Sequence, residues 1–158
     1  GTSYHAPEEF DLIKHLMSQA KHHQVKVHTP CDAVCGISPN QPGKIYTLDP
    51  QHTYEKIMDI GPKTIKEYSQ LISQAKRVLY TGPMGVYESS HYKTGSQAML
   101  KAMAESQAHT LIGGGDTLAI LKDTPYTFDD FNHCSTGGSA FLGFSQGLVT
   151  LKAFKEYA

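Results

Sequence analysis

Hydrophobic and polar positions along the chain follow patterns that predict helices and short strands in turn. From Pro7 to His23 the apolar residues recur at helical spacing, behind a proline and two glutamates that favour a helix start. Asp59-Ile60-Gly61-Pro62 predicts a second helix start, with the proline in its first turn. Helical patterns also cover His91 to Ala108 and the residues from Asp116 to Leu121.

Short apolar runs between these helices predict strands at Val25–Val27, Lys44–Leu48, Arg77–Tyr80, Thr110–Ile112 and His133–Ser135. The polar, proline-rich segment from Ser38 to His52 otherwise indicates a loop. Strands and helices that alternate along a chain favour a parallel sheet with helices on both of its faces. The predicted fold class is therefore α/β, a three-layer and Rossmann-like parallel sheet, in a single domain over residues 1–158.

Composition adds mainly exclusions to this prediction. The chain has 158 residues, of which 39% are hydrophobic and 18% charged, as in ordinary globular proteins. A net charge of −1 gives no basic excess for a phosphate backbone, so we expect no nucleic-acid partner. No apolar run is long enough to span a bilayer, so we expect no membrane partner. Three cysteines leave at least one unpaired, which fits a reducing compartment.

Three glycine-bearing segments follow predicted strands: Gly82 to Gly85, Gly113 to Gly115, and Gly137-Gly138. In parallel α/β sheets, ligands bind beyond the carboxyl ends of the strands. Glycines at a turn from strand to helix let backbone N–H groups approach an anion closely. Three such turns on one rim predict a long, phosphate-bearing ligand that lies across it.

Polar residues beside these turns each have two possible roles. Asp116 is either a helix cap or a ligand that holds Mg²⁺ beside phosphate oxygens. Thr117 either begins a helix or offers its N–H and hydroxyl to the same phosphates, and Glu88 is either solvated or an acceptor for ribose hydroxyls. The P-loop, dinucleotide and protein-kinase signatures are all missing from the sequence.

Four motifs in order make the chain resemble the C-terminal part of phosphoglycerate kinase. Residues 59–62 resemble the family's D-x-G-P helix start, and GPMGVYE at 82–88 resembles its N-G-P-x-G-V-F-E loop. GGGDT at 113–117 resembles the G-G-G-D-[TS] turn, and STGG at 135–138 resembles the S-T-G-G-G turn. Earlier, residues 25–32 are similar to the V-x-[IL]-x-P-x-D strand.

This resemblance implies an enzyme with two lobes around a cleft, which transfers a phosphoryl group between 1,3-bisphosphoglycerate and ADP in glycolysis, with Mg²⁺. The chain would be the C-terminal portion of the nucleotide-binding lobe, without the N-terminal substrate lobe and its catalytic arginine. The full-length protein would be a monomeric, cytoplasmic phosphotransferase that forms 3-phosphoglycerate and ATP. We expect this piece alone to be inactive.

The resemblance also assigns roles to individual residues. Gly113, Gly114, Gly115 and Asp116 would lie along the phosphates, with Asp116 as the Mg²⁺ contact and Thr117 capping the phosphates. Pro83 and Val86 would line the adenosine pocket, with Glu88 on the ribose. Gly137 and Gly138 would offer backbone N–H groups to the phosphoryl group in flight.

Three positions depart from the family pattern. Thr81 replaces an asparagine, while Ile57 and Ser139 each replace a glycine. We expect Ser139 to adopt helical dihedrals, because serine is tolerated in a first helical turn. The departures favour an alternative reading, a catalytically silent nucleotide-binding or interaction module descended from this lobe. The retained motifs favour the kinase.

Overall fold

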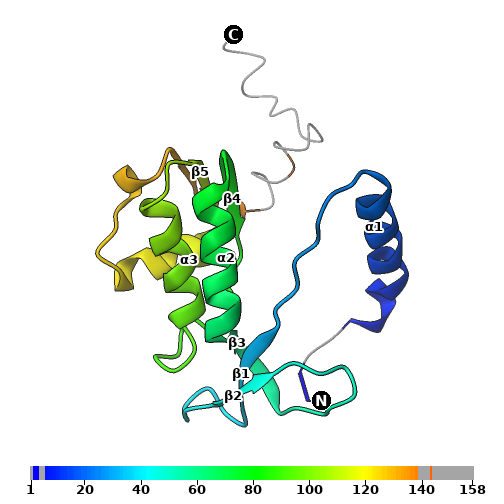
Figure 1. Ribbon diagram of the computed structural model, residues 1–158. Coiled ribbons are helices and arrows are strands. Elements are labelled where there is room, and N and C mark those ends of the chain that lie inside the picture. Colours follow the sequence, from blue (N-terminus) through cyan, green and yellow to red (C-terminus); the bar gives the residue numbers. More distant parts are fainter. Residues whose placement is uncertain (1, 4–5, 139–142, 144–158) are drawn as a thin grey trace.

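The computed structural model describes residues 2–3, 6–138 and 143, and shows an α/β arrangement with two small sheets (Figure 1). One sheet is antiparallel, with strand order β2-β1-β3, and the other is parallel, with order β4-β5-β6. The predicted α/β class with a parallel sheet is confirmed. The antiparallel sheet is an addition that the sequence patterns did not predict.

The antiparallel sheet is formed by residues 32–60. Its strands are β1 (Asp32–Gly36), β2 (Lys44–Thr47) and β3 (Lys56–Ile60), with β1 in the centre. The predicted strand at Lys44–Leu48 is confirmed as β2. The strand β3 runs directly into the start of the second helix, so Asp59 lies at the end of a strand rather than in the helix itself.

The parallel sheet holds the three strands that precede the glycine turns. These are β4 (Arg77–Thr81), β5 (His109–Gly113) and β6 (His133–Ser135), and each was predicted to within one residue at either end. Thr81 pairs in register with Gly113, which pairs in turn with Ser135. The carboxyl ends of the three strands therefore meet at one edge of the sheet.

Helices α2 (Pro62–Gln74) and α3 (Thr94–Ala104) lie side by side against the parallel sheet (Figure 1). The remaining helices are short or terminal: η1 (Pro7–Glu9), α1 (Phe10–His22), α4 (Gly115–Ala119), η2 (Ile120–Asp123) and η3 (Phe128–Asp130). The helix predicted at His91–Ala108 is shorter at both ends. Over the described ranges, no helix combines the length and apolar character needed to cross a membrane.

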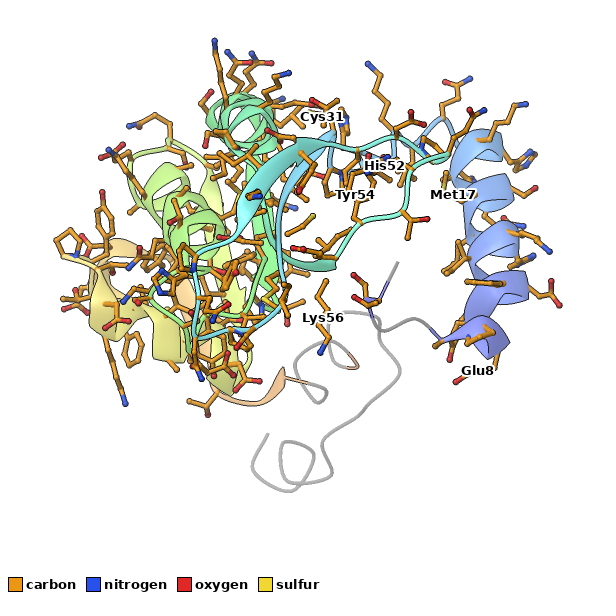
Figure 2. All side chains as sticks on the ribbon, turned by 90° about the horizontal axis from the view of Figure 1, so that it is seen from below. Glu8, Met17, Cys31, His52, Tyr54 and Lys56 are labelled. Carbon is orange, nitrogen blue, oxygen red and sulfur yellow. The ribbon has the colours of Figure 1, made fainter. Side chains whose placement is uncertain are left out.

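The first helix stands apart from both sheets, as Figures 1 and 2 show from two directions. In Figure 2, Met17 on α1 lies far from Cys31, where an extended segment reaches the antiparallel sheet. No residue of α1 is buried. The strand predicted at Val25–Val27 is wrong, because this segment lies outside any strand and both valines are exposed. A strand needs a neighbouring strand to pair with, and no strand of the described residues pairs with this segment.

The hydrophobic core lies between the parallel sheet and the helices that follow β4 and β5. Its buried members are Ile60, Tyr80, Met99, Leu100, Met103, Ile112, Leu118, Ile120, Leu121 and Phe131. Met99 and Met103 face inward from α3. On α2, Ile65 and Ile72 pack against the core, while Leu71 is exposed.

Two buried aspartates fix the starts of α2 and α3. The Asp32 carboxylate at the start of β1 accepts hydrogen bonds from the backbone N–H of Lys63 (2.9 Å) and of Thr64 (2.8 Å). It also accepts one from the Thr64 hydroxyl at 2.7 Å. Burial acts to raise the pKa of Asp32, but these hydrogen bonds outweigh it, and the pKa lies below its ordinary value.

Asp59 plays the same part for α3. Its carboxylate accepts hydrogen bonds from the backbone N–H of Gly95 and of Ile60, both at 2.9 Å. Burial raises the pKa of Asp59, against the opposing effect of these hydrogen bonds. The aspartates of the P-x-D and D-x-G-P motifs therefore serve as remote helix caps that join the antiparallel sheet to α2 and α3.

Candidate functional site

The candidate site is the carboxyl edge of the parallel sheet, where the three predicted glycine turns meet. The loop after β4, the turn after β5 and the turn after β6 begin beside one another, because Thr81, Gly113 and Ser135 are paired in register. The sequence had predicted this convergence from the parallel alternation alone. It is the arrangement in which α/β sheets bind ligands.

The triple glycine makes the sharpest turn at this edge. Gly113 is the last residue of β5, and Gly114 has φ 103° and ψ 137° before α4 begins at Gly115. The Gly114 N–H donates to the Ser135 carbonyl at 2.9 Å, while its own carbonyl accepts the N–H of Leu118 at 3.0 Å. Gly114 therefore turns the chain from strand to helix in a conformation that residues with a Cβ rarely adopt.

Replacing Gly114 by alanine is expected to lower the free energy of unfolding by about 2 kcal/mol, because this backbone region is strained for any L side chain. Gly115→Ala is the matched control. Gly115 is helical, and an added Cβ there meets no atom within 4 Å. We expect that change to be neutral or to stabilise by up to about 1 kcal/mol. Urea unfolding of both variants measures the difference, and equal effects would contradict the assignment of strain to Gly114.

The turn after β6 approaches the triple glycine. The Gly137 N–H donates to the Ser135 hydroxyl at 3.3 Å. A Cβ built on Gly138 would lie 3.4 Å from the Gly114 Cα, so these two glycines are in close contact. Ser139, for which we expect helical dihedrals, lies outside the described residues.

The loop after β4 is hydrogen-bonded to the start of α4. Gly82, at φ 84°, donates its N–H to the Thr117 hydroxyl oxygen at 2.8 Å. Thr117 is buried, with 1% of its surface exposed. Its hydroxyl thus joins the first and second glycine turns. The role of Thr117 toward phosphates stays a prediction.

Asp116 is exposed and directly precedes Thr117, which accepts the hydrogen bond from Gly82. Its Oδ1 accepts a hydrogen bond from the Tyr87 hydroxyl at 3.1 Å. That hydrogen bond raises the pKa of Tyr87, with smaller contributions from burial and from the charges of Asp116 and Glu88. Tyr87 was missing both from the predicted site and from the three departures named above, although its hydroxyl is a fourth difference from the family pattern, which has phenylalanine there.

The remaining predicted residues lie on the same loop. Pro83 and Val86 are half-buried and Glu88 is exposed. The Val86 N–H donates to the Met58 carbonyl at 2.8 Å, which ties the loop to β3. Ile57, one of the three departures, is the neighbouring residue of β3 and is exposed.

Metal ligation in the part of the chain that the structure describes has no preformed cluster of ligands to start from. No group of three or more His, Cys, Asp or Glu side chains is arranged there to hold a metal ion. Magnesium does not need such a group, because it commonly binds through one or two carboxylates together with substrate phosphates. The exposed Asp116 carboxylate between glycine turns fits that chemistry.

Comparison with known proteins identifies relatives over nearly the whole chain. The family model of phosphoglycerate kinase matches residues 1–148. The chain is 40% identical over 149 residues to the phosphoglycerate kinase of Clostridium tetani, covering 93% of this chain and 37% of that protein. It is 35% identical over 160 residues to the phosphoglycerate kinase of Anaeromyxobacter sp. (strain K), and this match covers 99% of this chain and 40% of that protein. The chain thus spans well under half the length of these curated relatives.

Solved structures give the same result. The phosphoglycerate kinase of Coxiella burnetii matches with a TM-score of 0.84 at 33% identity, over 94% of this chain and 38% of that one. The phosphoglycerate kinase of Pyrococcus horikoshii matches with a TM-score of 0.63 at 29% identity, over 88% of this chain and 36% of that one. With its fold, its ordered motifs and these relatives in agreement, the chain belongs to the phosphoglycerate kinase family.

Proposed function

We propose that this chain is the nucleotide-binding part of a glycolytic phosphoglycerate kinase. The whole protein would transfer a phosphoryl group from 1,3-bisphosphoglycerate to ADP, with Mg²⁺, and release 3-phosphoglycerate and ATP in the cytoplasm. The observation that carries the proposal is the meeting of three glycine turns around Asp116, at the carboxyl edge of a parallel sheet, in a chain of this family. 1,3-Bisphosphoglycerate would be held by a further lobe.

The glycines serve this reaction through their backbone. Gly113 ends the central strand β5, and Gly114 and Gly115 follow it, so the backbone of this turn would lie along the nucleotide phosphates without interference from side chains. Gly137 and Gly138, beside Gly114, would donate to the transferring phosphoryl group. Such fixed donors suit phosphoryl transfer, in which catalysis consists mainly of positioning and charge stabilisation.

Asp116 and Thr117 would act at the phosphate end of the nucleotide. Asp116 would hold Mg²⁺, and the ion, when bound, neutralises negative charge on the phosphate oxygens. The Thr117 hydroxyl accepts from Gly82 and keeps a proton with which to donate to a phosphate oxygen. At the other end, Pro83 and Val86 would line the adenosine pocket, with Glu88 accepting from the ribose hydroxyls.

Asp116→Ala is expected to weaken the binding of ADP with Mg²⁺ by about 1.5–3 kcal/mol, the range for a charge-assisted contact. The binding of ADP without Mg²⁺ should barely change, because the carboxylate contacts the nucleotide only through the ion. Isothermal calorimetry on the full-length protein, with Mg²⁺ and with a chelator, measures both affinities. Asp129→Ala, which removes another exposed carboxylate from η3, is the control and should bind as the wild type does. Equal losses with and without Mg²⁺ would leave Asp116 as a helix residue only.

The three departures from the family pattern support a second candidate, a catalytically silent nucleotide-binding or interaction module. Thr81 lies at the carboxyl end of β4, and its hydroxyl would be 3.6 Å from a Cβ on Gly114, so one departure falls inside the site. The intact mass of the native protein in its source cell, followed by its turnover, separates the candidates. A full-length, active protein supports the kinase, and a native chain near 17.4 kDa without turnover supports the module.

A further inference from the structure

The hydrogen bond from Tyr87 to Asp116 is part of a double connection across the candidate site. Two consecutive residues, Asp116 and Thr117, each accept a hydrogen bond from the loop after β4, at 3.1 Å from Tyr87 and at 2.8 Å from Gly82. The Gly82 bond uses backbone and is available to any sequence with glycine and threonine there. The Tyr87 bond uses a side-chain hydroxyl, which the family pattern G-V-F-E lacks at this position.

Tyr87 is built to hold this hydroxyl in place. Its ring is partly buried and packs against the hydrophobic core, and its backbone N–H donates to the Gly85 carbonyl at 2.8 Å. The next residue but one, Ser89, closes a turn by donating its N–H to Val86 at 3.0 Å. The Tyr87 hydroxyl is the donor in this contact, because the carboxylate oxygen can only accept. The donor is thus fixed, whereas the carboxylate that it contacts is exposed.

We propose that Tyr87 is a positioning residue for the metal-bound nucleotide: its hydroxyl fixes the orientation of the Asp116 carboxylate by binding Oδ1 and leaves Oδ2 to face the ligand. This inference rests on the proposed function, in which Asp116 holds Mg²⁺. An exposed aspartate otherwise samples several rotamers and loses that freedom when a ligand binds. A carboxylate that is already oriented loses less on binding, which increases affinity without a new contact to the ligand.

Tyr87→Phe tests the inference, because it removes only the hydroxyl and keeps the ring in the core. In the full-length protein we expect ADP with Mg²⁺ to bind about threefold to tenfold more weakly, the range for one side chain that must be newly ordered. ADP in the presence of a chelator should bind as it does to the wild type. Calorimetry measures both affinities. A general loss of packing would weaken the binding of ADP with and without Mg²⁺ alike, whereas the inference predicts a loss only with Mg²⁺.

Tyr126→Phe is a matched control. The Tyr126 hydroxyl donates to Glu105 Oε1 at 3.0 Å, so this variant also removes an exposed tyrosine–carboxylate hydrogen bond, but from elements outside the glycine turns. We expect no change in either affinity. A loss in Tyr126→Phe equal to that in Tyr87→Phe would overturn the inference, since the effect would then not depend on Asp116.

Asp116→Asn and the double variant that combines Tyr87→Phe with Asp116→Asn separate this inference from the proposed function. If Tyr87 acts through the carboxylate, the double variant binds ADP with Mg²⁺ no more weakly than Asp116→Asn does. If Asp116→Asn weakens binding and Tyr87→Phe does not, the positioning role is wrong while the nucleotide site stands. If Asp116→Asn has no effect, the proposed metal contact itself is wrong. A double variant markedly weaker than Asp116→Asn would also overturn the role, by showing that Tyr87 acts elsewhere.

Discussion

A protein consisting of these 158 residues alone is expected to transfer no phosphoryl group from 1,3-bisphosphoglycerate to ADP above background. Phosphoryl transfer depends on cationic groups beside the transferring oxygens, and an arginine that supplies one contributes about a thousandfold or more. The chain has a single arginine, Arg77, at the first position of β4. Thr81, at the site, is four residues further, which corresponds to about 13 Å along a strand. The only guanidinium is therefore at the opposite end of the sheet.

An assay that couples ATP formation to a spectroscopic signal measures this prediction, with the complete protein that carries the same sequence as the positive control. Circular dichroism of the 158-residue protein checks that it is folded, and calorimetry checks separately that it binds ADP with Mg²⁺. Turnover within tenfold of the complete protein would contradict the expectation and would mean that the glycine turns and Asp116 suffice for catalysis.

Asp32→Ala is expected to lower the free energy of unfolding by about 4 kcal/mol, a larger loss than that expected for Gly114→Ala. The variant leaves the backbone N–H groups of Lys63 and Thr64 without their acceptor, and a lost partner in a buried place costs about 1–3 kcal/mol. The Thr64 hydroxyl loses its shorter hydrogen bond to the carboxylate and keeps only the Asp32 carbonyl, at 3.2 Å. It also removes the cap of α2. Urea unfolding of the full-length protein at neutral pH measures the change.

Asp49→Ala is the control for this substitution. Its carboxylate also accepts a backbone N–H, from Gln51 at 2.9 Å, but in an exposed turn where water can replace it. We expect a loss below about 1 kcal/mol. A similar loss in both variants would show that burial of the Asp32 carboxylate does not matter.

The effect of Asp32 is also expected to depend on pH. Because its pKa in the folded protein lies below the unfolded value of about 3.9, the stabilisation is present above that value and is lost as the pH falls through the folded pKa. The difference between wild type and Asp32→Ala should therefore narrow below about pH 4. A difference that widens on acidification would contradict the lowered pKa.

The parallel sheet could be predicted from the sequence because its signals are local. The strands β4 and β5 contain short apolar runs that are followed by glycine, and proline marks the start of the helix that precedes β4. The pairing of Thr81, Gly113 and Ser135 then follows from the parallel order, which brings the glycine turns together. The candidate site could be located for the same reason.

The antiparallel sheet could not be predicted in this way. β1 begins with a buried aspartate, and β3 carries an exposed isoleucine, so neither has clear alternation. What makes Asp32 tolerable in the interior is Thr64, which lies 32 residues along the chain, a distance that no local pattern covers. At Val25–Val27 a strand was predicted where none forms. Apolar and polar residues alternate there, but the structure gives the segment no neighbouring strand. The Tyr87 contact was missed because its partner is 29 residues away.

The two remote caps have an evolutionary consequence. A descendant of this lobe that lost its catalytic role would still need Asp32 and Asp59 to begin α2 and α3, so selection for folding alone would preserve the P-x-D and D-x-G-P motifs. Asp116 is under no such requirement, because it is exposed and its side chain caps no helix. In a lineage released from nucleotide chemistry, Asp116 would change first and the buried aspartates last. The identity of that one exposed residue is thus a better mark of a working kinase than the number of motifs retained.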